Sequence, residues 1–335
     1  MKRLAWLLPL LVGLCASSAR ADTPPNTWDA LANPALADHY ALHVQVRELI
    51  AAASTKHDEN AMAFLNKARV LLREAHAETS DDVVLQFDVG EVCQELHEYG
   101  CAIDTLERAL AKAPDHPAAE GAYDALATAY AKLDRSADEL RVYDRSIARV
   151  TNPVSVAVFM LNRAEAYMHL GRLDDAIAEY TATANEASTF PNAVEQQFHT
   201  GVLAWWGLAV ALDRVGDVAG GAAKAKFATE LDHDMRVIAT GENVFFVPER
   251  ERDWYVALGF IEYAKQAADA EESAALFHRA EDCWHDYIDD VKDHGEHDQW
   301  VRIAKARLEW THQQRTLAEK RARRRIVYPQ YRCIG

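Results

Sequence analysis

The chain has 335 residues, half of them apolar, and a formal net charge of −16 with histidine counted as neutral. The apolar share is enough to build a continuous core. The acidic balance argues against nucleic acid as the main partner, because phosphate binding needs Lys and Arg clustered on one surface.

Residues 1–21 have the features of a secretory signal peptide. Residues 2–3 are positively charged, residues 4–12 form a short apolar run, and residues 19–21 place small side chains at the two positions that a signal peptidase reads. The run is too short to span a bilayer of about 30 Å comfortably. No other stretch approaches membrane-spanning length, so we expect a mature chain that is periplasmic or secreted after cleavage near Ala21. A lipid anchor at Cys15 is the minor alternative, because a large leucine precedes this cysteine.

Residues 22–82 are predicted to contain a linker followed by one helix pair. Apolar residues recur with helical periodicity over 35–54. Asp58 stands where a second helix would begin, and aspartate is a common helix N-cap. Segment 35–78 therefore reads as one helix pair with weak motif content.

One spacing of small and large side chains occurs four times between residues 83 and 235. A small residue is followed three positions later by an apolar one, and twelve positions later by a second small or loosely matching residue. A large and a small position lie four and seven residues beyond that. The four sets are Gly90, Cys93, Ala102, Leu106 and Ala109; Ala127, Tyr130, Glu139, Tyr143 and Ser146; Ala164, Tyr167, Ala176, Tyr180 and Thr183; and Ala209, Leu212, Gly221, Ala225 and Ala228. Small residues let two short helices approach closely, and such pairs stack because one pair alone cannot bury its apolar face.

This pattern resembles the tetratricopeptide repeat, a unit of about 34 residues that forms two antiparallel helices. The best single match is segment 163–184, and the four units would span 83–116, 120–153, 157–190 and 202–235. The resemblance implies an all-α fold, a right-handed superhelical solenoid of antiparallel helix pairs. The chain departs from the repeat at Glu139, where a small residue is usual. It also departs at the closing proline, which Thr151, Ser188 and His233 replace.

Segment 236–251 interrupts the repeats and is predicted to be an inserted apolar loop. Gly241 and Asn243 mark a turn, and four apolar residues follow at 244–247 before Pro248. A solvent-exposed pair of phenylalanines would be unfavourable, so this run is expected to cover another part of the chain. A packing seam between helix pairs is the favoured interpretation. A lid over the inner groove is the alternative.

Two further elements complete the predicted solenoid. Segment 252–294 is a degenerate helix pair of the same type. Segment 295–335 contains a C-terminal capping helix over 299–325 and then a basic tail. The basic run is best explained as a solvated helix end. Contact with the acidic body, with an acidic partner or with an anionic membrane surface is the alternative.

Four cysteines remain after removal of the signal peptide, namely Cys93, Cys101, Cys283 and Cys333. An even number in an exported chain permits disulfides, and four cysteines allow three pairings. In the layout that the resemblance implies, Cys93 lies near the end of a first helix and Cys101 near the start of the second. The pairs Cys93–Cys101 and Cys283–Cys333 are therefore favoured. The equally weighted alternative is that Cys93 and Cys283 are small core residues.

The sequence contains little that indicates catalysis. There is no G-x-S-x-G, no H-E-x-x-H and no Gly-rich phosphate loop, so we expect neither an enzyme nor a cofactor. One polar stripe is the exception, formed on one helix face by His278, Asp282, His285 and Asp289, with His294 and His297 just beyond. Imidazole with carboxylate suits zinc or nickel, but four ligands along one straight helix cannot all reach one ion. A hydrated polar face is favoured, and a metal-dependent enzyme or metal-binding protein using His278, Asp282 and His285 is the alternative function.

The resemblance also implies a binding surface, because the first helices of such repeats line a concave groove. The corresponding positions are Phe87, Glu91, Gln94, Glu95, Asp124, Thr128, Lys132, Leu161, Glu165, His169, Trp206, Asp213, Arg214, Phe260 and Tyr263. This mixture of aromatic and acidic side chains would suit a protein or peptide partner that is basic and carries apolar anchors. We therefore expect a non-catalytic protein–protein interaction scaffold of the cell envelope, which holds a partner segment in this groove.

Overall fold

The computed structural model describes residues 34–54, 59–187, 195–240, 246–293 and 298–322, together with Ile326, Tyr328 and Cys333. The predicted signal peptide and the linker up to residue 33 lie outside the described residues. So do residues 241–245 of the expected apolar loop and the two histidines of the 294–297 segment.

Every regular element among the described residues is helical. Fourteen α-helices and two short 3₁₀ helices follow one another, and no strand occurs in this part of the chain, so the all-α prediction is confirmed. The chain divides into two compact units, residues 1–155 and 156–335, which are taken in turn. None of the described helices combines the length and the apolar character needed to cross a bilayer.

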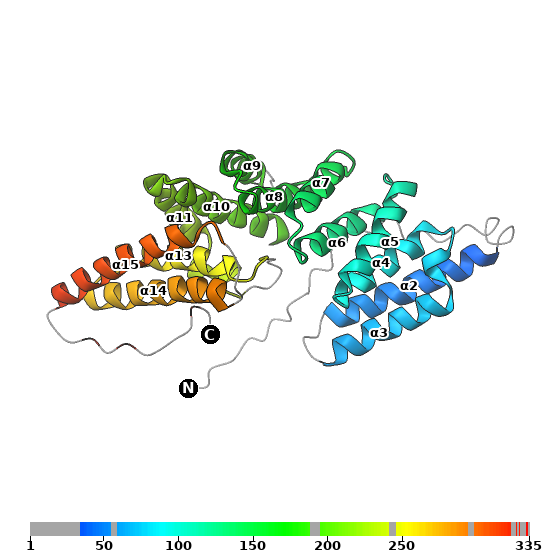
Figure 1. The fold of residues 1–335 in the computed structure, drawn as a ribbon, viewed down its shortest axis with the longest axis horizontal. Helices are drawn as coiled ribbons and strands as arrows, with labels where there is room; N and C mark the ends of the chain where they lie inside the picture. The colour runs from blue at the N-terminus through cyan, green and yellow to red at the C-terminus, as the bar shows by residue number, and fades with distance from the viewer. Residues whose placement is uncertain are drawn as a thin grey trace, which may run out of the picture. The chain divides into compact units, whose positions relative to one another are not determined.

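The first unit is built from six helices that pack in chain order. They are α2 (Pro34–Ser54), α3 (Glu59–Glu74), α4 (Val83–Glu95), α5 (Tyr99–Lys112), α6 (Ala119–Ala131) and α7 (Ser136–Ile147), with the 3₁₀ helix η1 (Ala77–Thr79) before α4. Each helix contacts the next, and α4 also lies against both α2 and α6 (Figure 1). The first helices of successive pairs, α2, α4 and α6, are therefore neighbours, which is how stacked helix pairs bury one continuous core.

Small residues set the distance between the two helices of a pair. A Cβ atom on Gly90 would lie 2.3 Å from two side-chain carbons of Leu106, so α4 and α5 approach closely only because residue 90 has no side chain. Ala102 and Ala109 of α5 are fully buried in the same region. In the second unit, a Cβ atom on Gly221 of the second helix would lie 3.0 Å from the carbonyl oxygen of Ala209 in the first helix of the same pair. The recurring small-and-large spacing of the sequence therefore corresponds to close helix packing.

The corner between α4 and α5 is a tight C-cap. The backbone of His97 is in the left-handed region, with a φ of 60°. Its N–H donates to the carbonyl of Gln94 at 2.9 Å, and the N–H of Glu98 donates to the carbonyl of Cys93 at 2.8 Å. These two bonds satisfy carbonyl groups that the helix end leaves unpaired, as in a Schellman motif. The motif reverses the chain within three residues and sets α5 against α4.

The second unit contains the remaining helices. They are α8 (Pro153–His169), which begins just before the boundary, α9 (Leu173–Ala187), α10 (Glu195–Val215), α11 (Val218–Leu231), α12 (Arg236–Thr240), α13 (Glu251–Gln266), α14 (Ala270–Asp293) and α15 (Val301–Ala322), with the 3₁₀ helix η2 (His233–Met235) before α12. Helix α10 packs between α9 and α11, and α13, α14 and α15 pack in series (Figure 1). The last helix thus covers α14, in the position expected for the capping helix.

Aromatic side chains fill the core of the second unit. Trp254 is fully buried and meets Trp284 and Tyr287 edge to face, with ring centroids 5.1 and 5.3 Å apart. Such T-shaped pairs add to the stabilisation from area burial. Phe246 is also buried and packs edge to face on Tyr255 of α13, at 5.0 Å. The described end of the expected loop therefore belongs to the core.

The segment expected as an inserted loop begins as a helix. Residues 236–240 form α12, directly after η2, and only the residues from Phe246 to Arg250 are irregular among those described. The helical start has a local cause, because the Asp232 carboxylate accepts a hydrogen bond from the Val237 N–H at 2.9 Å. A carboxylate that satisfies a free N–H group near a helix start favours the helix.

Candidate partner-binding surface

Five of the fifteen predicted groove residues are buried. Phe87, Trp206, Asp213, Arg214 and Phe260 are each at most 4% exposed to solvent. They form the core rather than the wall of a groove, which corrects the assignment made from the sequence. The physical reason is that a helix with neighbours on several sides buries most of its circumference, so repeat position alone does not decide which side chain reaches solvent.

Asp213 and Arg214 belong to a buried ionic network in the second unit. Arg214 donates to Glu251 at 2.7 Å and lies over the ring of Trp254, 4.4 Å from its centroid. Asp213 accepts from Arg307 at 2.8 Å and from the Trp254 indole N–H at 3.1 Å. Buried charges are tolerated only when paired and hydrogen-bonded in this way. The network joins α10, α13 and α15 and accounts for both residues structurally.

The other groove residues of the second unit are only partly exposed. Leu161, Glu165, His169 and Tyr263 all retain some solvent contact. The His169 carbonyl accepts from Gln299 at 3.1 Å, and the Tyr263 hydroxyl donates to the Asp232 carbonyl at 3.5 Å. These four residues all belong to the second unit.

The first unit carries the solvent-accessible part of the predicted surface. Glu95, Asp124 and Lys132 are exposed there, and Glu91, Gln94 and Thr128 are half-buried, so α4 and α6 present six of the predicted groove residues. Three of the six are carboxylates and one is a lysine. This surface, called the α4–α6 face below, is therefore predominantly acidic.

Glu91 of α4 contacts both neighbouring helices, α2 and α6. It forms an ion pair with Arg47 of α2. Its Oε1 atom also lies 3.0 Å from the position that a Cβ on Gly121 of α6 would occupy. The absence of a side chain at residue 121 thus lets a carboxylate of α4 lie directly against α6. Next to it, Glu120 accepts a hydrogen bond from the Ser155 hydroxyl.

Desolvation and electrostatic repulsion act together on the carboxylates of this face. The surrounding protein and the negative charges of Glu91, Glu95 and Glu120 raise the pKa of Asp124 to about 6, although its side chain remains open to solvent. Partial desolvation and the charge of Glu91 likewise raise the pKa of Glu95. Carboxylates that crowd one another in this way gain stability from any cation that binds between them.

A buried hydrogen-bonded pair joins α2 to α4, one of the two helices of the α4–α6 face. His43 of α2 and Asp88 of α4 are hydrogen-bonded through Nδ1 and Oδ2 at 2.8 Å, and both side chains are almost inaccessible. Burial raises the pKa of Asp88 to about 6, against the opposing effect of the hydrogen bond from His43. Local sequence spacing does not predict this pair, because the two residues lie 45 positions apart in the chain.

The candidate metal ligands of the polar stripe on α14 do not converge on one point. His278 lies 3.9 Å from carboxylate oxygens of Glu281 and of Asp282, and His285 is exposed. Among the described residues, the ligand atoms of three or more such side chains converge within 4.8 Å only at Cys93, Glu98 and Cys101. The alternative function built on His278, Asp282 and His285 therefore gains no support from this geometry.

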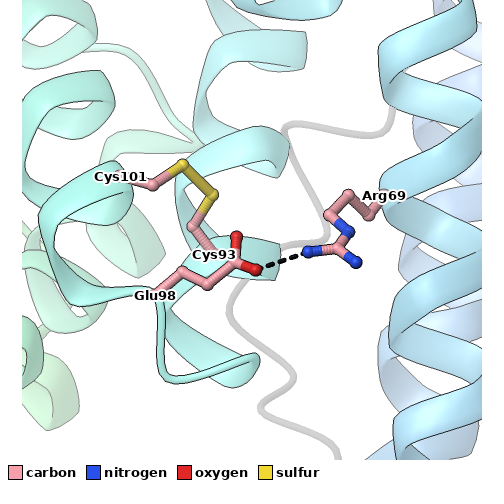
Figure 2. Close-up of a disulfide and its surroundings, with 4 residues drawn as sticks. All are labelled: Arg69, Cys93, Glu98 and Cys101. Carbon is pink, nitrogen blue, oxygen red and sulfur yellow. Dashed lines mark hydrogen bonds and ion pairs between the residues drawn. A yellow bond between two sulfur atoms is a disulfide. The ribbon is translucent and has the colours of Figure 1, made fainter.

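The four cysteines of the expected mature chain form two disulfides. Cys93 bonds to Cys101 across the α4–α5 corner, with their Cα atoms 5.9 Å apart, and Cys283 of α14 bonds to Cys333. These are the pairings that the helix-pair layout favoured. Figure 2 shows the first disulfide with the Glu98 carboxylate beside it and Arg69 reaching that carboxylate from α3.

No protein-family model matches this chain, and no curated protein is significantly similar to it in sequence.

Proposed function

We propose that this chain is a non-catalytic scaffold that holds a basic segment of a partner protein on the α4–α6 face. The observation that carries the proposal is that four carboxylates, Glu91, Glu95, Glu120 and Asp124, lie near one another. Desolvation, and then repulsion from the other three carboxylates, raises the pKa of Asp124 to about 6. Lysine or arginine side chains of a partner would relieve this repulsion.

The form of the surface also favours a segment of chain over a small molecule. The acidic side chains come from two neighbouring helices, and half-buried Gln94 and Thr128 add hydrogen-bonding groups to the same face. A rigid helical surface needs no ordering when a partner binds, which reduces the entropic penalty of association. An extended or helical segment with apolar anchors between its basic residues would match this arrangement.

The proposal includes the wider setting expected from the sequence. The helix pairs would be of tetratricopeptide type and would continue as a right-handed solenoid. The chain would act in the cell envelope after export and cleavage near Ala21. Export is supported by the character of residues 1–21 and by two disulfides, which persist in oxidising compartments.

Selection from a random peptide library tests the proposal. Peptides displayed on phage are selected on the immobilised chain, and their binding is then measured to wild type and to the double variant Glu95→Lys/Asp124→Lys. We expect enrichment of peptides with Lys or Arg among apolar residues. The double variant should weaken their binding by about tenfold or more, and added salt should weaken it for wild type.

The matched control is Asp104→Lys/Asp174→Lys, which makes the same change in net charge at exposed positions of second helices. These side chains lie on α5 and α9, two helices that contribute no residue to the α4–α6 face. Enriched peptides should bind this control as they bind wild type. Selection without basic enrichment, or equal losses in the two double variants, would refute a specific role for the α4–α6 face.

A further inference from the structure

The α4–α5 corner has counterparts in the next two helix pairs. Between α6 and α7, Asp134 has a φ of 55°, and the N–H of Arg135 donates to the Tyr130 carbonyl at 3.0 Å. Between α8 and α9, Gly171 has a φ of 71°, and the N–H of Arg172 donates to the Tyr167 carbonyl at 2.9 Å. All three corners therefore use the same C-cap, and their residues can be compared position by position.

Side chains close the second and third corners without a covalent bond. In each, an arginine lies over the tyrosine five residues before it, at 4.6 Å for Arg135 on Tyr130 and 4.4 Å for Arg172 on Tyr167. In each, the same arginine pairs with an aspartate three residues later, at 2.7 Å. These aspartates are Asp138 and Asp175. Each of these two corners therefore has a tyrosine, an arginine five residues later and an aspartate three residues after that. The arginine stacks on the tyrosine and forms an ion pair with the aspartate.

The first corner places a different chemistry at the same three positions. Cys93 stands where the tyrosine would be, Glu98 where the arginine would be, and Cys101 where the aspartate would be. The two sulfur atoms and a carboxylate oxygen of Glu98 lie within 4.8 Å of one another (Figure 2). The neighbouring corners show that closing this turn requires neither cysteines nor a carboxylate at the position of Glu98.

Solvent reaches two of the three side chains, those of Glu98 and Cys101. Glu98 is exposed, Cys101 is half-buried, and only Cys93 is buried. A small recess lined by residues of α3 and α4, among them Leu72 and Val92, opens onto the disulfide. Arg69 pairs with Glu98 from the far side of this recess and holds the carboxylate next to the sulfur atoms (Figure 2).

We propose that reduction of the Cys93–Cys101 disulfide creates a binding site for a thiophilic divalent cation such as Zn²⁺. The ligands are the two cysteine sulfurs and the Glu98 carboxylate, and water completes the shell. Thiolates with a carboxylate are a ligand set that zinc accepts, and three protein ligands leave one position open. The site goes beyond the proposed scaffold function and does not depend on it.

The chemistry balances with a dithiol as reductant. The dithiol supplies two electrons and two protons, the Cys93–Cys101 S–S bond breaks to give two thiols, and the reductant leaves as its own disulfide. The cation then displaces the two thiol protons, which pass to solvent, because zinc binds the thiolate form. A disulfide oxidant takes up two electrons and is itself reduced to thiols, while the Cys93–Cys101 bond forms again. This step removes both thiolates and expels the cation, so binding reports the redox state of this corner.

Cobalt spectroscopy tests the site in the full chain. The protein is reduced with a phosphine, freed of the reductant without oxygen, and titrated with Co²⁺ and then with Zn²⁺. We expect one Co²⁺ per chain with thiolate-to-cobalt charge-transfer absorption, and displacement of that ion by Zn²⁺. The oxidised chain should give no such absorption. Absence of the signal in the reduced chain would overturn the proposal.

Four variants assign the ligands. Cys101→Ser should abolish the charge-transfer signal, and Glu98→Gln should weaken Zn²⁺ binding by at least about tenfold. Cys283→Ser/Cys333→Ser should leave both unchanged. The triple variant Cys93→Tyr/Glu98→Arg/Cys101→Asp copies the neighbouring corners, so it should keep the helical circular-dichroism spectrum and lose the metal. Signal retained in Cys101→Ser, lost in the Cys283/Cys333 variant, or unaltered Zn²⁺ affinity in Glu98→Gln would each refute the three-ligand site.

Discussion

At the scale of single residues, Glu139 shows how a departure from a sequence pattern becomes a physical property. The repeat pattern has a small residue at this position, and the sequence places a carboxyl there. The side chain is only 4% exposed, and its Oε2 atom has no hydrogen-bond partner among the described residues. Burial raises the pKa of Glu139 to about 8, although a hydrogen bond with Tyr143 acts in the opposite direction. The residue is therefore mainly protonated in the folded chain at neutral pH.

We predict that Glu139→Gln removes part of the pH dependence of stability. The pKa of Glu139 is 4.5 in the unfolded chain and about 8 in the folded chain. Its contribution to the free energy of unfolding is therefore fully present below pH 4.5 and is lost as the pH rises through 8. The loss over this window amounts to about 4 kcal/mol. Urea unfolding between pH 5 and 8.5 measures it. A glutamine needs no protonation, so the variant should lose less stability with rising pH than wild type, whereas parallel pH profiles would place Glu139 in solvent.

At the scale of the helices, the sequence predicted the elements well because their cause is local. Helix pairs require small residues where two axes cross, and these residues recur at fixed distances along the chain. Two of the corners were also predictable from the sequence, because they contain Gly171 and Gly216, and glycine adopts positive φ values at little cost. The corners at His97 and Asp134 carried no such signal, because a side chain there adopts the left-handed region only in the context of the cap.

Two glycines in neighbouring helices give a matched test of close packing. A Cβ on Gly90 of α4 would lie 2.3 Å from Leu106, whereas a Cβ on Gly100 of α5 would meet no atom within 4 Å. We predict that Gly90→Ala lowers the free energy of unfolding by about 1–3 kcal/mol through overpacking. Gly100→Ala should be neutral or stabilising by up to about 1 kcal/mol, because alanine favours the helix. Equal effects in urea unfolding would show that α4 and α5 are not in tight contact at residue 90.

At the scale of the whole molecule, the candidate surface was less predictable than the helices. The exposed carboxylates of α4 and α6 were identified from their repeat positions, whereas Trp206 and Phe260, identified by the same rule, proved to be buried. Burial at a given position depends on what the neighbouring helices bring to it, and those neighbours lie far away in sequence. The pair of Arg214 and Glu251, which are 37 positions apart, illustrates the same limit.

The two disulfides stabilise different units and close loops of different length. Cys93 and Cys101 are 8 positions apart and lie in the first unit, whereas Cys283 and Cys333 are 50 positions apart and lie in the second. In the chain-entropy model a longer loop loses more freedom in the unfolded state, which gives about 2.5 kcal/mol for the short loop and about 4 kcal/mol for the long one. We therefore predict a larger loss of stability in Cys283→Ala/Cys333→Ala than in Cys93→Ala/Cys101→Ala.

Tryptophan fluorescence separates the two effects. The tryptophans among the described residues all lie in the second unit, at Trp205, Trp206, Trp254, Trp284, Trp300 and Trp310. In a Trp28→Phe background, which removes the remaining tryptophan of the expected mature chain, their emission follows unfolding of that unit, while far-ultraviolet circular dichroism follows the helices of both. Removal of the Cys283–Cys333 bond should shift the fluorescence transition to lower urea, and removal of the Cys93–Cys101 bond should shift only the circular-dichroism transition. A fluorescence shift of equal size in both variants would mean that the two units unfold as one cooperative body, because a bond confined to the first unit would then also stabilise the second.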